Sequence, residues 1–207
     1  MDIFFTFLEM LGTLAFAASG AMVGIKKKMD IFGIAMLGVT TAVGGGVIRD
    51  VILGILPPTT FRHPQYAVAA IVISIIIFLP FIRKKADHSN LLLDRLMLIA
   101  DSIGLGVFTV SGIKTAVDAG FGGNGFLLVF VGVVTGVGGG VLRDVMAGER
   151  PYIFVKHIYA CASLIGAVIC IAIFRLIGIE LGMAAGCVAV FVIRMCSAKF
   201  QWSLPKP

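Results

Sequence analysis

The sequence predicts an all-α integral membrane protein with seven transmembrane helices, built as an inverted three-plus-three repeat with one extra helix. Three observations support this fold class. Of the 207 residues, 59% are hydrophobic and 14% are charged, whereas a soluble domain has roughly 25% charged residues. The apolar runs last about twenty residues, which is the length that a spanning helix needs. Two long stretches of the chain also repeat each other.

The apolar runs define the predicted spans in order. We predict spans over residues 3–25, 33–55, 64–82, 92–113, 125–147, 157–175 and 178–197. Turn and charge signals separate them, such as KKKMD after the first run and LPPTTFRHP after the second. The strands of membrane barrels alternate polar and apolar residues in segments of about ten, and these runs do not. The seven spans use nearly the whole chain, so we expect residues 1–207 to form a single membrane domain.

The first run begins without a basic leader, which predicts a transmembrane helix rather than a cleaved signal. The net charge of +6 does not indicate a nucleic-acid partner, because the basic residues lie in short connections between apolar runs. The four cysteines, Cys161, Cys170, Cys187 and Cys196, lie in apolar runs without a CxxC spacing. We expect them to be small buried side chains rather than metal ligands or a disulfide framework.

Lysine and arginine are distributed unequally between the two sides of the predicted bundle. Because consecutive connections alternate between sides, one side receives twelve of these residues and the other receives three, Arg62, Lys114 and Arg175. The side richer in basic residues is normally cytoplasmic. We therefore predict a multi-pass protein of the inner (plasma) membrane with its N-terminus outside and its C-terminus in the cytoplasm. A basic face of this kind also attracts anionic lipid, the one bound group that we expect besides transported ions.

The repeat is visible in two segments, GVTTAVGGGVIRDVILG at residues 38–54 and GVVTGVGGGVLRDVMAG at residues 132–148. Their glycines and charges correspond at a spacing of 94 residues, and Ser19-Gly20 corresponds to Ser111-Gly112 at a spacing of 92. Since each repeat has three spans, an odd number, the second copy enters the membrane from the opposite side. We predict repeat one over residues 3–82, the inverted repeat two over residues 92–175, and the extra helix over residues 178–197.

Three consecutive glycines lie near the middle of the second and fifth spans, at Gly44, Gly45 and Gly46 and at Gly138, Gly139 and Gly140. One glycine costs a helix about 1 kcal/mol relative to alanine, so that three in a row weaken it locally. A break exposes backbone carbonyl and N–H groups, which suit a cation or an anion in a polar cavity. We predict such breaks in both helices. Close packing of the two helices through the glycines is the alternative.

Polar residues accompany both glycine triplets and favour a pathway over packing. Thr40, Thr41 and Thr135 precede the triplets, while Arg49, Asp50, Arg143 and Asp144 follow them. Charges within the membrane are costly and usually mark an ion or substrate path. Adjacent helical residues point about 100° apart, so Arg49 and Asp50 are not expected to face each other. We predict one Arg–Asp layer on each side of a central constriction; snorkelling of the arginines to the interface is the alternative.

Other polar residues lie within or at the ends of spans. We expect Ser19, Asp101, Ser111 and Lys114 to line a vestibule or to take part in gating. Glu9 and Lys114 are better interpreted as charges at helix ends near the headgroups. The segment GVGGGVLRD lacks the Lys-Ser/Thr of a phosphate loop and follows no predicted strand. With no nucleophile beside a base and no cofactor motif, the sequence does not predict an enzyme.

The seven spans, the inverted repeat and the motifs GGGVIRDV and GGGVLRDV resemble the prokaryotic trimeric intracellular cation (TRIC) channels over essentially the whole chain. The resemblance implies a homotrimer with one pore inside each protomer, permeable to monovalent cations such as potassium. It also implies that the second and fifth spans line the pore around Gly44–Gly46 with Arg49 and around Gly138–Gly140 with Arg143.

Three functions remain open at this level. The first is a potassium-permeable cation channel. The second is a carrier for a small zwitterionic substrate such as glycine, because an arginine near the path suits a carboxylate and inverted repeats are common in carriers. The third is an assembly protein in which the glycines only pack helices together.

Overall fold

The computed structural model describes residues 3–79, 90–155 and 158–202, and every regular element in these ranges is helical. The elements are α1 (Ile3–Lys26), α2 (Ile31–Ile52), α3 (Thr59–Arg62), α4 (Gln65–Phe78), α6 (Asn90–Ala116), η1 (Val117–Phe121), α7 (Gly125–Met146), α8 (Tyr152–Val155), α9 (Tyr159–Leu176) and α10 (Ile179–Phe200). Six of these helices are long and apolar enough to cross a membrane, and α4 is a shorter apolar helix. The predicted fold class is confirmed.

Each predicted span corresponds to one helix, with ends that differ by a few residues. The third span ends differently, because α4 is described as far as Phe78 and residues 80–82 lie outside the described residues. The connections predicted after the second and fifth spans contain the short helices α3 and α8, which the turn signals did not reveal.

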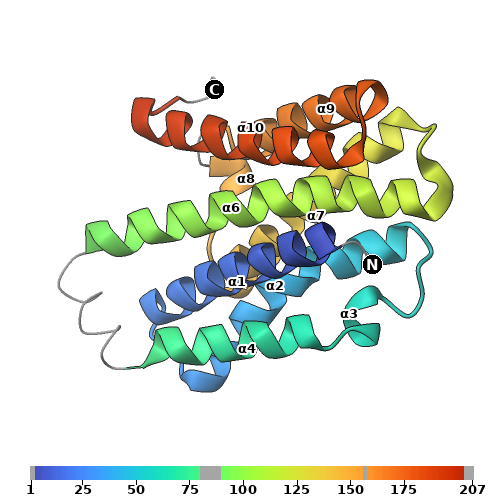
Figure 1. Ribbon diagram of the computed structural model, residues 1–207. Coiled ribbons are helices and arrows are strands. Elements are labelled where there is room, and N and C mark those ends of the chain that lie inside the picture. The colour runs from blue at the N-terminus through green and yellow to red at the C-terminus, as the bar shows by residue number, and fades with distance from the viewer. Residues whose placement is uncertain (1–2, 80–89, 156–157, 203–207) are drawn as a thin grey trace.

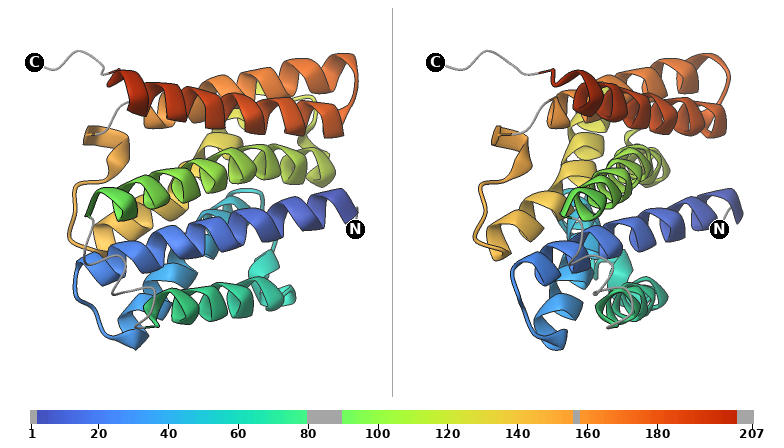
Figure 2. Two further views of the ribbon diagram at one scale, coloured as in Figure 1. Left: turned by 60° about the vertical axis from the view of Figure 1, so that its left-hand side comes forward. Right: turned by 90° about the vertical axis from the view of Figure 1, so that its left-hand side faces the viewer.

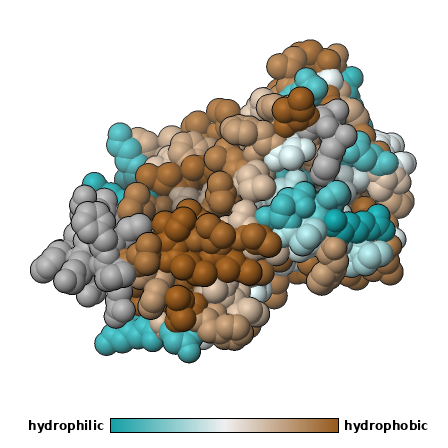
Figure 3. Space-filling model, turned by 60° about the horizontal axis from the view of Figure 1, so that its bottom comes forward, coloured by the Kyte–Doolittle hydropathy of each residue, from teal (hydrophilic) through white to brown (hydrophobic). Residues whose placement is uncertain are grey.

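The helices pack in successive layers (Figures 1 and 2). α9 and α10 lie together along one side of the bundle, α6 and α7 follow, then α1 and α2, and α4 lies on the opposite side against α1 and α2. α2 and α7, the second helices of the two repeats, contact each other in the interior. The large apolar side chains that remain exposed suit a lipid environment, and Figure 3 shows the face on the side of α4 as mostly hydrophobic.

Equivalent residues begin and end α2 and α7. Asp30 and Asn124 cap their first turns by accepting hydrogen bonds from the N–H groups of Gly33 at 2.7 Å and Leu127 at 3.1 Å. Both helices end before a glycine of positive φ, Gly54 at 71° and Gly148 at 69°. Glycine adopts this conformation without steric cost, and it closes the last turn. The last turns of both helices therefore present their Arg–Asp pairs in the same way.

The predicted breaks at Gly44–Gly46 and Gly138–Gly140 are wrong, because α2 and α7 run as continuous helices through both triplets. The glycines instead allow the two backbones to touch. A Cβ atom on Gly45 would lie 2.2 Å from the Thr135 carbonyl oxygen, and one on Gly139 would lie 2.1 Å from that of Thr41. The alternative of close helix packing through small residues describes the observed crossing.

Candidate functional site

The first charged cluster forms at the end of α2. The Arg49 Nε donates a hydrogen bond to Asp50 Oδ1 at 2.8 Å, and Arg49 NH2 lies 2.8 Å from the same oxygen. Glu9 of α1 lies 3.8 Å from Arg49 NH1 and accepts a hydrogen bond from the Ser111 hydroxyl at 2.8 Å. The other Asp50 oxygen accepts the Thr59 N–H at 2.6 Å. This cluster joins α1, α2, the start of α3 and α6.

The second charged cluster forms at the end of α7. Arg143 Nε donates to Asp144 Oδ1 at 2.8 Å, and Arg143 NH1 donates at 2.6 Å both to Asp101 Oδ1 and to the Ser19 hydroxyl. The other Asp144 oxygen accepts the Tyr152 N–H at 2.8 Å. This cluster joins α6, α7, the start of α8 and α1.

The two clusters are built from corresponding positions of the two repeats. Each contains an Arg–Asp pair from the second helix, an acidic residue from the first helix of the same repeat, and a serine from the first helix of the other repeat. Glu9 corresponds to Asp101 at the spacing of 92 residues that relates Ser19 to Ser111. The inverted arrangement therefore appears in side-chain contacts as well as in the order of helices.

Burial and pairing decide several of the sequence predictions. Arg49 and Arg143 are 4% and 0% exposed, so neither snorkels to an interface. Arg49 and Asp50 do pair, as do Arg143 and Asp144, although neighbours on a helix were expected to point apart; the long arginine side chain folds back onto the next carboxylate. Glu9, interpreted as a headgroup charge, is 7% exposed and belongs to the first cluster.

The remaining predicted residues lie around the helix crossing. Thr41 and Thr135 are fully buried and donate their hydroxyls to the carbonyls of Leu37 and Val131, each at 2.6 Å, within their own helices. Thr40, one residue away, is half-buried. Lys114, at the end of α6, pairs with Asp118 at 2.5 Å. Among the described residues, no group of acidic, histidine and cysteine side chains has the arrangement of a metal site.

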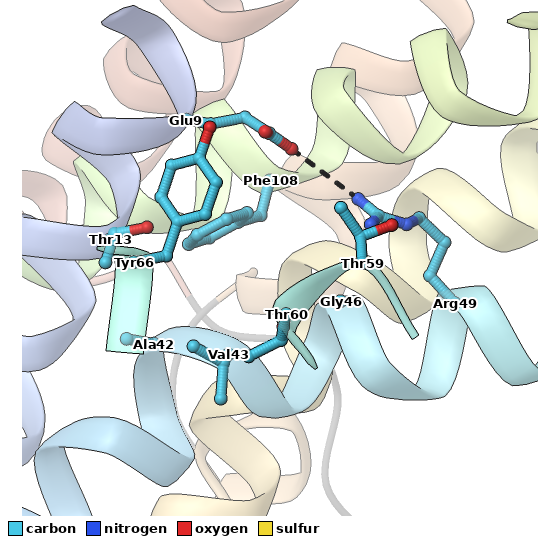
Figure 4. A pocket seen from close by; sticks show the side chains of 10 residues that line it. All are labelled: Glu9, Thr13, Ala42, Val43, Gly46, Arg49, Thr59, Thr60, Tyr66 and Phe108. Atoms are coloured by element: carbon cyan, nitrogen blue, oxygen red, sulfur yellow. Dashed lines mark ion pairs between the residues drawn. The ribbon is translucent and has the colours of Figure 1, made fainter. Parts of the chain in front are cut away.

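The first cluster borders open space. A cavity of about 330 Å³ is lined by Glu9, Arg49, Thr59, Lys114 and Asp118 among others. A smaller cavity of about 30 Å³ adjoins it and shares Glu9, Arg49 and Thr59 with it. Figure 4 shows this inner cavity, which extends along α2 from Arg49 towards Ala42 and is bordered by Thr13 of α1 and Tyr66 of α4.

Aromatic side chains and a third arginine cover the second cluster. The backbone N–H of Tyr152 takes the place that the Thr59 N–H has in the first cluster. The Tyr152 ring lies 5.1 Å from the Arg143 guanidinium carbon. Arg194 of α10 lies over the Tyr159 ring at 4.7 Å and within 3.7 Å of Asp101 Oδ2. Asp101 is 1% exposed. Among the described residues, two aromatic rings and a third arginine therefore lie against the second cluster, whereas the first cluster borders the two cavities. The sequence did not predict this difference.

The Thr59 N–H is expected to contribute measurably to the first cluster. Thr59→Pro removes this donor, and proline is tolerated there because Thr59 is the first residue of α3 and Pro58 has an extended ψ of 146°. Loss of a hydrogen bond to a charged group should lower the free energy of unfolding by about 1.5–3 kcal/mol. Thermal unfolding in detergent measures this. Thr59→Ala keeps the N–H and is the matched control; equal losses in both variants would contradict the role of the backbone donor.

Comparison with known proteins finds a matching family model and a similar relative. The model of a family described as "Glycine transporter" matches residues 6–81 and 98–175. The inner membrane protein YadS of Escherichia coli K12, a UPF0126 protein, is 36% identical over 200 residues, which cover 96% of this chain and 93% of YadS.

Two solved structures share the fold over nearly the whole chain. One is the TRIC trimeric intracellular cation channel orthologue from Rhodobacter sphaeroides, with 33% identity, a TM-score of 0.87, and coverage of 97% of this chain and 100% of that one. The other is a prokaryotic TRIC channel in 0.5 M KCl, with 31% identity, a TM-score of 0.89, and coverage of 99% and 100%.

Proposed function

This chain belongs to the Glycine transporter family, and from its close structural similarity to TRIC channels we propose that it is a channel for monovalent cations, including potassium. The observation that carries the proposal is the match of the whole fold, at TM-scores of 0.87 and 0.89, to cation channels. These structural relatives are channels and not enzymes. By the same similarity we propose a homotrimer in the inner membrane, with a pathway inside each subunit and the apolar outer surface against lipid.

The proposed pathway does not require broken helices. It starts in the cavity beside Glu9 and Arg49 and follows α2 through the inner cavity towards the crossing with α7. The backbone contacts of Gly45 and Gly139 close the crossing in this conformation. We propose that conduction requires α2 and α7 to separate there, and that Thr41, Gly46, Thr135, Gly140 and Arg143 border the opened route. The N-terminus is proposed to lie outside and the C-terminus inside, following the distribution of basic residues.

A carrier for a small zwitterion, such as glycine, is the second candidate. The outer cavity offers both signs of charge, Arg49 and Lys114 for a carboxylate and Glu9 and Asp118 for an ammonium group. The description of the matching family favours the same substrate class. A volume of about 330 Å³ is ample for a molecule of this size.

Planar bilayer recording of the purified protein under asymmetric potassium chloride separates the two candidates. A cation channel should give unitary current steps that reverse near the potassium equilibrium potential. Saturable uptake of glycine into vesicles, with no unitary steps, would support the carrier and contradict the channel.

The open space beside Thr59 is expected to be required for the current. Thr59→Tyr introduces, beside the first cluster, a ring equivalent to the Tyr152 ring beside the second cluster. The new ring occupies the cavity, so unitary conductance should fall several-fold. Phe61→Tyr, on the same short helix but at a side chain that is 70% exposed, is the control. Unchanged conductance in the Thr59→Tyr variant would place the pathway elsewhere.

A further inference from the structure

We propose that the Glu9 carboxylate and the inner cavity beside it form a binding site for one monovalent cation, and that Arg194 prevents an equivalent site at Asp101. The inference rests on the proposed function for its role in transport, but the site itself is argued from charge, cavity and donor atoms. It assigns different tasks to the two halves of a repeat whose sequences are closely similar.

The charges of the first cluster leave one negative charge unbalanced. Both close contacts of the Arg49 guanidinium, at 2.8 Å, go to Asp50, which balances it. Glu9 lies 3.8 Å from Arg49 NH1, beyond hydrogen-bond distance, and its 2.8 Å partner, Ser111, is neutral. At the outer end of the cavity Lys114 and Asp118 also pair. The five charged groups therefore sum to minus one, and Glu9 carries the excess.

An unbalanced charge that is 7% exposed is costly unless a counter-charge accompanies it. A monovalent cation neutralises the cluster, whereas a divalent cation would leave an excess positive charge in the same low-dielectric surroundings. The required counter-ion is therefore monovalent.

The inner cavity supplies space and oxygen donors for this ion. Its volume of about 30 Å³ holds a water molecule or an ion of similar size. The Tyr66 hydroxyl, on a side chain that is 6% exposed, lies beside the Glu9 side chain in Figure 4 and interacts with the Glu9 carboxylate. The Thr13 and Thr59 side chains border the same space. Carboxylate and hydroxyl oxygens can replace part of the hydration shell of a cation.

The corresponding position in the second repeat is already electrically neutral among the described residues. Asp101 contacts Arg143 at 2.6 Å and Arg194 at 3.7 Å, so that two arginines face Asp101 and Asp144 and the four charges sum to zero. Arg194 comes from α10, the helix that has no counterpart in the repeat. Its guanidinium lies over Tyr159, which takes the place of Tyr66 beside the acidic residue. The extra helix thus supplies a fixed positive charge where the first half has an open cavity.

The test is potassium-dependent thermal stability of the full chain in detergent, with N-methylglucamine chloride replacing potassium chloride at constant ionic strength. The wild-type midpoint should rise by a few degrees and saturate with potassium, because a ligand that binds only the folded state stabilises it. Glu9→Gln keeps the size of the side chain and an oxygen for Ser111, and should abolish the saturable rise. Asp94→Asn removes an exposed carboxylate that lines neither cavity and pairs with Lys26, and should retain it.

A wild-type protein without a potassium-specific rise, or a Glu9→Gln variant that keeps it, would overturn the site. A rise that is lost equally in Asp94→Asn would also overturn it, because the effect would then be a general one of protein charge. Potassium flux into vesicles made from the same preparations separates this result from the proposed function. Potassium flux without saturable stabilisation would support the channel proposal and contradict the binding site. Stabilisation that depends on Glu9, without flux, would support the binding site and contradict the channel proposal.

Discussion

Gly45→Ala should destabilise the protein far more than Gly46→Ala, although the two glycines are adjacent in α2. The added Cβ of Gly45→Ala would lie 2.2 Å from the Thr135 carbonyl oxygen and 3.3 Å from the Gly139 nitrogen. These are backbone atoms of α7, so the helices must separate. Overpacking of a dense interior typically costs about 1–3 kcal/mol, and a backbone clash of this size places the variant at or above the upper end.

Gly46→Ala is the matched control because its Cβ would meet only Arg49, at 3.7 Å. Both substitutions raise helix propensity by the same amount, so the difference between them reports the crossing alone. Thermal unfolding in detergent, followed by the reaction of a thiol dye with the free cysteines as they become exposed, measures both variants. Similar midpoints for the two variants would contradict the backbone contact between α2 and α7.

Arg143→Gln should be the most destabilising change among the buried charges. It removes the partner of Asp101 and Asp144 and the hydrogen bond that Arg143 donates to Ser19, at an arginine that is 0% exposed. Breaking a buried ion pair from one side typically costs about 3–5 kcal/mol, because the remaining charge stays buried without compensation. The same thermal unfolding measurement should show a large decrease in the midpoint.

Arg49→Gln is the matched control from the other repeat. Glu9, one of its two acidic partners, borders cavities that can admit water, so this carboxylate is partly solvated once the arginine is gone and the loss should be smaller. A loss in Arg49→Gln equal to or greater than that in Arg143→Gln would contradict the expected solvation of Glu9 in the cavities beside it.

The helical class and the approximate spans were predictable because each depends on the run length of apolar residues, which lipid selects directly. The geometry at the glycines was not. Three glycines weaken a helix and also permit close approach, and the sequence alone does not say which effect dominates. The outcome depended on the partner: the Gly45 and Gly139 regions face each other, so that each triplet provides the surface on which the other packs.

The Arg–Asp pairs were recognised as functional candidates, but their partners were only partly predicted. Asp101, Ser19 and Ser111 were named without a contact, and Glu9 was interpreted as a charge at a helix end near the headgroups. The signal that could have placed Glu9 was available: it precedes Asp101 by 92 residues, as Ser19 precedes Ser111. Arg194 carried no comparable signal, because α10 has no counterpart in the repeat.

The exchange of serines between the clusters has a consequence for how the molecule could arise. Ser19, in the first repeat, accepts a hydrogen bond from Arg143 of the second repeat, and Ser111, in the second repeat, donates one to Glu9 of the first. Neither repeat therefore completes its own polar network. A single ancestral three-helix chain, paired with an identical copy in the opposite orientation, would satisfy both networks with one set of residues. Fusion of two such copies would then allow the two networks to diverge, as they have here where Arg194 of α10 contacts Asp101 and cavities border Glu9.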